Sequence, residues 1–137
     1  MDAGRILDHQ WVDDGPGWAA VEVSSAEEVL ALEPDFSGLP EAMVGVVGAR
    51  GRRGPGEAAY EVRAFAPGAD VAEDPVTGSL NASIGQWFLA RGDVPLPYTV
   101  SQGARVGRAG LLTASHVEGA VWVGGAAITR IVGEVAM

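Results

Sequence analysis

The 137-residue chain contains no cysteine and no lysine. Without cysteine it can form no disulfide, no thiolate metal site and no thiol nucleophile. Without lysine it can form no pyridoxal phosphate Schiff base and cannot use a P-loop lysine. All positive side-chain charge lies on nine arginines, which pair with carboxylates but do not shuttle protons. We therefore expect no cofactor held through these groups.

Positive charge is also scarce, because the formal net charge is −9. Nucleic-acid binding needs a basic face for the phosphates, and an anionic membrane surface attracts basic segments, so we expect neither partner. No apolar run is long enough for a spanning helix or a signal peptide. The apolar fraction of 47% is that of a globular protein with a real core. We expect one domain over residues 1–137 and a cytoplasmic location.

The most informative segment is the run Glu73-Asp74-Pro75-Val76-Thr77-Gly78-Ser79, which leads into an apolar-striped stretch from Leu80 to Ala90. A proline fits the first turn of a helix, and aspartate, threonine and serine can each cap the free amides there. The spacing predicts a central, largely buried helix from Leu80 to Arg91 that begins at this turn, with Gly92 as C-cap.

This turn has two interpretations. It can be a well-capped helix start and nothing more. It can also be a ligand site, because free amides and the positive end of the helix dipole attract a carboxylate or phosphate. Gly78, which has no Cβ, would let such a ligand approach the backbone closely.

The rest of the chain predicts short strands and one further helix, which together indicate an α+β fold. We expect a helical turn over Gly4–His9, a GPGW loop, and a helix capped by Ser24 or Ser25 and running through Leu32. A glycine- and arginine-rich turn, Arg50–Glu57, should join two strands into a hairpin. The predicted strands are Trp18–Val23, Val44–Ala49, Tyr60–Phe65, Tyr98–Gln102, Gly110–Val117, Ala120–Val123 and one or two within Ala126–Val135.

Four motifs of the chain resemble the phenazine-biosynthesis PhzF-like family. They are the EDPVTGS string (residues 73–79), the Gln102-Gly103 pair, the Val123-Gly124-Gly125 turn and the segment Trp11–Trp18 with its GPGW stretch. Together they extend from about residue 11 to residue 133, and they resemble only the second half of such proteins. The resemblance implies a diaminopimelate epimerase-like half, in which a curved mixed β-sheet wraps around one central helix.

The resemblance also implies site residues. It places Asp74 in the active site and gives Ser79 a part in holding the substrate, with Thr77 and Gly78 as further donors to a substrate carboxylate. A helix N-terminus stabilises the ionised form of Asp74, so we assign this residue orientation and charge stabilisation rather than proton abstraction. Gln102 and Gly103 would lie where the family's QG pair approaches the ligand, although a plain strand end followed by a glycine turn fits them equally well.

Other polar residues have weaker support as site residues. Glu73 adjoins the motif, but neighbours on a turn usually point elsewhere. His9 and His116 match no catalytic context and make no metal site, because they are far apart and have no cysteine or carboxylate cluster beside them. Arg50, Arg52 and Arg53 could bind an anion or form a solvated loop tip.

Three functions remain open at this point. The first is a PhzF-like isomerase or epimerase half that moves a proton on a small carboxylate-bearing metabolite without a cofactor. The chain would then need a partner. Pairing with a separate first-half subunit would supply the missing proton-carrying glutamate, and the alternative is a homodimer with a second copy of the chain. The second is a non-catalytic small-molecule binding module, and the third is a truncated piece of a two-domain enzyme.

Overall fold

A computed structural model describes residues 5–137 of the chain. Its helices are α1 (Ala26–Ala31) and α2 (Gly78–Arg91), with 3₁₀ turns η2 (Pro67–Ala69) and η3 (Ala104–Val106). Its strands are β1 (Ile6–Asp13), β2 (Gly17–Val23), β3 (Val44–Ala49), β4 (Tyr60–Ala66), β5 (Val71–Asp74), β6 (Tyr98–Gln102), β7 (Gly110–Val117) and β8 (Ala120–Gly125).

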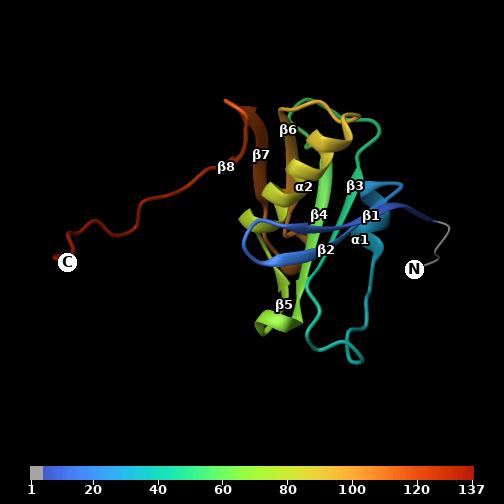
Figure 1. The fold of residues 1–137 in the computed structure, drawn as a ribbon, viewed down its shortest axis with the longest axis horizontal. Coiled ribbons are helices and arrows are strands. Elements are labelled where there is room, and N and C mark those ends of the chain that lie inside the picture. Colours follow the sequence, from blue (N-terminus) through green and yellow to red (C-terminus); the bar gives the residue numbers. More distant parts are fainter. Residues whose placement is uncertain (1–4) are drawn as a thin grey trace.

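The strands form one mixed sheet in the order β1-β2-β3-β4-β6-β7-β8, with β5 added to β4. The pairs β2–β3 and β4–β6 are parallel, and the other pairs are antiparallel. The sheet curls around α2, since strands from both of its ends, β1 and β8, contact that helix (Figure 1). The predicted α+β fold, a curved mixed sheet around a central helix, is confirmed.

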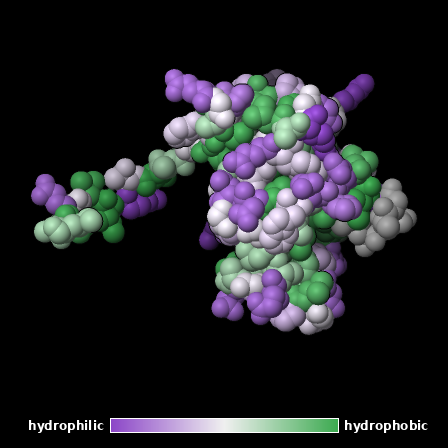
Figure 2. Space-filling model, in the orientation of Figure 1, coloured by the Kyte–Doolittle hydropathy of each residue, from purple (hydrophilic) through white to green (hydrophobic). Residues whose placement is uncertain are grey.

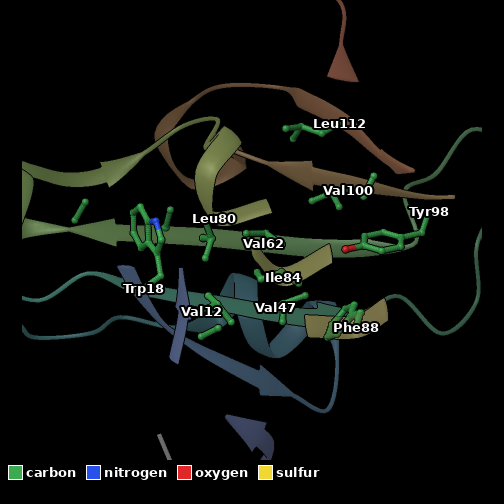
Figure 3. Packing of buried hydrophobic residues seen from close by; sticks show 14 residues of the cluster. Val12, Trp18, Val47, Val62, Leu80, Ile84, Phe88, Tyr98, Val100 and Leu112 are labelled. Atoms are coloured by element: carbon green, nitrogen blue, oxygen red, sulfur yellow. The ribbon is translucent and has the colours of Figure 1, made fainter. Parts of the chain in front are cut away.

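The main core lies between α2 and the concave face of the sheet. Leu80, Ile84 and Phe88 follow one another along a single face of α2, and each is at most 1% exposed. Figure 3 shows these side chains directed toward valines of the neighbouring strands. Gly85 makes close packing possible here, because a Cβ built on it would lie 2.8 Å from the side chain of Val121 in β8.

Helix α1 packs on the opposite, outer face of the sheet. Successive residues of a strand point to opposite faces, and in β3 Val47 belongs to the α2 core whereas Val46 packs with Val29 of α1. As predicted, Ser25 caps α1 by accepting a hydrogen bond from the amide of Glu28 (3.2 Å). The helix ends against the guanidinium of Arg63, which donates hydrogen bonds to two of its last carbonyls.

The predicted secondary structure was wrong at both ends of the described chain. Residues 6–9 of the predicted helical turn belong to strand β1, which pairs with β2 from Ile6 to Asp13 with a register shift between Ile6 and Asp8. Gly4 lies outside the described residues. No strand forms within Ala126–Val135, because this segment runs away from the sheet and meets no neighbouring strand (Figure 1). Gly124 and Gly125 are not a tight turn but paired residues of β8.

Candidate functional site

The Asp74–Ser79 turn connects the end of β5 to the start of α2. Asp74 is the last residue of β5 and pairs with Ala64 of β4, which fixes its place at the sheet. Thr77 takes the N-cap position of α2, but its side chain makes no capping bond. The sequence predicted that Pro75 would lie in the first turn of the helix. In the structure Pro75 instead precedes the helix, which begins at Gly78. The hydroxyl of Thr77 is instead directed back toward Asp74.

A buried network of side-chain amides fixes the direction of every hydrogen bond in this turn. Gln102 Oε1 accepts from the backbone amide of Thr77 (3.2 Å), and Gln102 Nε2 donates to the Asp74 carbonyl (2.9 Å). Asn81 Nδ2 donates to Gln102 Oε1 and to the Thr77 carbonyl, both at 2.8 Å. Since backbone groups act only as donors or only as acceptors, they determine the orientation of both amides.

The same network determines how Asp74 is held. Gln102 Nε2 donates to the hydroxyl oxygen of Thr77 (2.8 Å), so the hydroxyl hydrogen of Thr77 points the other way. It points to Asp74 Oδ2, 2.5 Å away, and this oxygen must therefore accept. Asp74 is thus an oriented carboxylate on a rigid turn.

Gln102 and Thr77 have little capacity left for a ligand. Gln102 is 1% exposed, and its amide makes four hydrogen bonds within the turn. The Thr77 amide and hydroxyl both donate inside the network. Their role in the structure is to position Asp74 and the start of α2.

Free donors lie one residue further along, at Gly78 and Ser79. The first backbone bond of α2 runs from the amide of Asn81 to the Thr77 carbonyl (3.2 Å), so the amides of Gly78 and Ser79 precede the helical ladder. Gly78 is exposed, and a Cβ built on it would meet no atom within 4 Å. The Ser79 oxygen accepts from the indole Nε1 of Trp18 (3.2 Å), which leaves the hydroxyl hydrogen available to a ligand.

Gly103 holds the strand end of β6 close to this turn. Its φ of +96° lies in the left-handed region, and a Cβ built on it would lie 2.6 Å from the Pro75 carbonyl oxygen. No other residue fits this position without a shift of the backbone. The Gln102-Gly103 pair therefore holds the end of β6 against the Asp74–Ser79 turn, through the hydrogen bonds of Gln102 and the close approach of Gly103 to Pro75.

The remaining polar residues considered from the sequence lie away from the turn. Glu73 points to the opposite side of β5 and pairs with Arg63 through two bonds of 2.9 Å. His9 on β1 and His116 on β7 are exposed. Arg50 pairs with Glu61 at 3.1 Å, so it is part of the fold rather than a free anion site.

Sequence reasoning missed five buried polar residues, namely Glu22, Glu61, Arg63, Asn81 and Ser83. Asn81 follows Thr77 by one helical turn, and this spacing was the available signal for its bond to the Thr77 carbonyl. Glu61 is 1% exposed, and its Oε1 has no partner among the described residues. Burial raises the pKa of Glu61, while the Ser101 hydroxyl and Arg50 oppose this rise.

Other kinds of site find no support in the described residues. Within residues 5–137, no group of three or more histidine, aspartate or glutamate side chains is arranged to hold a metal ion. None of the helices seen there is long and apolar enough to cross a membrane. A cavity of about 1040 Å³ lies on the outer side of β5, where Phe36, Phe65 and Glu73 line it, and it does not include Asp74.

Known proteins are similar to this chain in sequence and in fold. A profile of the phenazine biosynthesis-like proteins (PhzC-PhzF) matches residues 2–133. "Antisense-enhancing sequence 1" of Schizosaccharomyces pombe is 33% identical over 137 aligned residues, which cover 90% of this chain and 45% of that protein. The chain thus spans less than half of this curated relative.

Solved structures agree on the fold. The PhzF-family phenazine biosynthesis protein of Enterococcus faecalis superposes with a TM-score of 0.65 at 24% identity, over 88% of this chain and 43% of that one. The PhzF-family protein of Bacillus anthracis gives a TM-score of 0.63 at 16% identity, over 85% and 44%. At these identities the likeness establishes the fold, while the sequence match establishes the family. This chain therefore belongs to the phenazine biosynthesis-like PhzC/PhzF family, of which it resembles a half-length form.

Proposed function

We propose that this chain binds a small carboxylate-bearing metabolite at the Asp74–Ser79 turn, as one half of a cofactor-independent isomerase or epimerase. One observation carries the proposal. The turn presents the free amides of Gly78 and Ser79 and the free hydroxyl hydrogen of Ser79, four and five residues after the oriented carboxylate of Asp74. Amides at a helix N-terminus bind a carboxylate, and Asp74 suits a substrate ammonium or hydroxyl group.

The residues of the turn support binding and orientation more than proton transfer. A 1,3-proton shift or an epimerisation needs a base whose pKa is tuned toward neutrality and a matching acid. Asp74 accepts a hydrogen bond from the Thr77 hydroxyl, which holds one of its oxygens in place, and the chain has no cysteine or lysine to serve as the base instead. We infer that the proton-carrying group comes from a partner, either a first-half subunit or a second copy of this chain.

Pairing also agrees with the shape of the site. Gly78 of the turn is exposed, and the chain covers only 43–44% of the two structural relatives described above. A second body is needed to exclude water from a substrate bound there. We place the assembled protein in the cytoplasm, with neither nucleic acid nor a membrane as partner.

Binding is tested by titrating an isotope-labelled chain with small 2-hydroxy and 2-amino acids while its backbone amides are followed by NMR. The amides of Gly78 and Ser79 should shift most, and Asp74→Asn should weaken the binding of the 2-amino acids. Asp70→Asn is the matched control, because Asp70 is an exposed carboxylate at the end of η2. Unchanged Gly78 and Ser79 signals at saturating ligand would contradict the proposal.

Catalysis is tested by the incorporation of solvent deuterium into the same acids. The isolated chain should give little or no exchange, and activity should need a partner. Rapid exchange by the chain alone, abolished in Asp74→Ala, would show that the lone half is itself the enzyme.

A non-catalytic binding module is the second candidate function. The saturated Gln102 network favours it, because a rigid turn that only orients a carboxylate is sufficient for sequestration or regulation. Carboxylate binding without exchange, even when a first-half chain of the family is added, would support this candidate.

A further inference from the structure

The segment after β8 is extended and apolar. From Ala126 to Met137 the chain forms no helix or strand, and Figure 1 shows it leaving the rest of the molecule. Ile131 and Val132 are 92% and 87% exposed, and Ile128 and Val135 are exposed to a similar degree. Figure 2 shows apolar residues along this segment, with hydrophilic ones between them. Soluble proteins seldom leave such a stretch in water.

The composition of this segment is that of a strand. It is rich in β-branched residues and contains no proline. Alternation in an extended chain puts Ile131 and Val135 on a side that carries no charge, and puts Ile128 and Val132 on the side that carries Arg130 and Glu134. What it lacks is a neighbouring strand, since a strand is stabilised by pairing and by contacts across the sheet.

An unprotected edge of the same molecule offers such a neighbour. Strand β1 is the last strand at its end of the sheet, and among residues 5–137 it pairs only with β2. It is eight residues long and has no proline, and after a register shift between Ile6 and Asp8 its pairing with β2 is regular as far as Asp13. Leu7 and Trp11 are more than 60% exposed on it. The opposite edge, β8, is six residues long and ends in two glycines, so it is the poorer template.

We propose that residues 126–137, the arm, add as a strand to the β1 edge of a second copy of this chain, and that the exchange is reciprocal. A second copy suits the arm because each chain carries one arm and one free β1 edge, so two copies leave neither unmatched. A two-fold exchange also closes the assembly. Ile128–Val135 is as long as β1, so it is long enough to pair along the regular part of the edge, Asp8–Asp13. This inference goes beyond the proposed function and does not depend on carboxylate binding.

The energy of the exchange comes from backbone pairing and from the apolar side of the arm. Strand addition satisfies the free amides and carbonyls of an edge. Burial of Ile131 and Val135 adds the hydrophobic contribution. Arg130 and Glu134, on the other side, stay in water.

Sedimentation at micromolar concentration tests the pairing. The wild type should have about twice the chain mass of 14.1 kDa at high salt, because the contact is apolar. The double variant Ile131→Asp/Val135→Asp should raise the dimer dissociation constant about tenfold or more. The matched control Arg130→Gln/Glu134→Gln changes the other side of the same arm and should leave the constant within twofold. A monomeric wild type, or a dimer unaffected by the two aspartates, would overturn the proposal.

The edge that receives the arm is tested by labelling, for which a cysteine-free chain is well suited. An unlabelled copy that carries a spin label on Arg130→Cys, on the side of the arm that stays in water, is mixed with ¹⁵N-labelled wild type. The label should attenuate the ¹⁵N amide signals of Ile6–Asp13 and spare those of β8. If the signals are attenuated only when the label and the isotope are on the same chain at low concentration, the arm pairs with the β1 edge of its own molecule, and the proposed exchange is overturned. Attenuation at β8 would overturn it as well.

Discussion

The indole Nε1 of Trp18 donates a hydrogen bond of 3.2 Å to the hydroxyl of Ser79, which joins β2 to the first turn of α2. Trp18 is 3% exposed, so the bond lies at the edge of the core rather than in open water. The bond orients Ser79 and leaves the serine hydrogen free. The GPGW segment and the EDPVTGS segment, far apart in sequence, therefore meet at one side chain.

Replacing this serine should weaken ligand binding. Ser79→Ala removes one donor, and we expect the affinity for a small carboxylic acid to fall by about 1 kcal/mol. Trp18→Phe is the control, since it removes the indole donor but keeps the serine hydroxyl. It should lower the free energy of unfolding and leave the affinity within about twofold. If Ser79→Ala lowers stability without changing affinity, the turn is only a helix cap.

Replacing Gln102 should test the direction of the hydrogen bonds in the turn. In Gln102→Glu a carboxylate oxygen faces the Asp74 carbonyl and the Thr77 hydroxyl, where an amide now donates. We expect the free energy of unfolding to fall by about 2–4 kcal/mol at pH 7, because a buried acceptor then faces another acceptor. Urea titration at pH 7 measures this loss, and part of it should disappear at pH 4, where the new side chain can donate. Wild-type stability at pH 7 would mean that the assigned direction is wrong.

Gly103→Ala should be more damaging than an equivalent change at a nearby glycine. The alanine must adopt a φ of +96° and place its Cβ 2.6 Å from the Pro75 carbonyl oxygen. We expect a loss of about 2–4 kcal/mol in the free energy of unfolding. Gly107→Ala is the matched control, because its φ is +72° but a Cβ there meets nothing within 4 Å. It should cost about 1 kcal/mol, and equal losses would argue against the close approach of Pro75.

Glu61 should make stability depend on pH. Burial raises its folded pKa, so between the ordinary glutamate pKa and the raised value the folded protein holds a proton that the unfolded chain has released. The free energy of unfolding should therefore fall as pH rises through this window, by up to about 1 kcal/mol per pH unit. Thermal or urea unfolding from pH 4 to pH 8 measures this slope. Glu61→Gln should remove that part of the slope, and identical pH profiles for the variant and the wild type would refute the prediction.

The sequence predicted the elements that are stabilised by local patterns. The apolar face of α2 and the turn residues around the hairpins determine these elements with little help from the rest of the chain. The main errors concern strands, including β5, which was not predicted, and strands need a partner. Residues 6–9 form a strand because β2 lies beside them. The arm forms no strand because no other strand lies beside it. A single sequence does not reveal which segments will meet.

The candidate site was predictable to a similar extent. The motif located the start of α2 and drew attention to Asp74 and Ser79. It could not show that Gln102 and Asn81 fix the turn, because those contacts connect residues from different elements and depend on the curl of the sheet. The role of Glu61 was hidden for the same reason, since its burial follows from the strands on both sides of β4.

The two parallel pairs of the sheet have a consequence for the order of folding. Antiparallel neighbours such as β7 and β8 are joined by a short turn and can form within microseconds. The parallel contact between β4 and β6, which aligns Tyr60 with Val100, must close a long stretch of chain that includes α2. Loop-closure entropy opposes such contacts until they form, so non-local pairing slows folding. We therefore expect hairpins to appear first and the docking of β6 on β4 to be the slow step, after which Gln102 arrives beside Thr77 and the turn takes its final form.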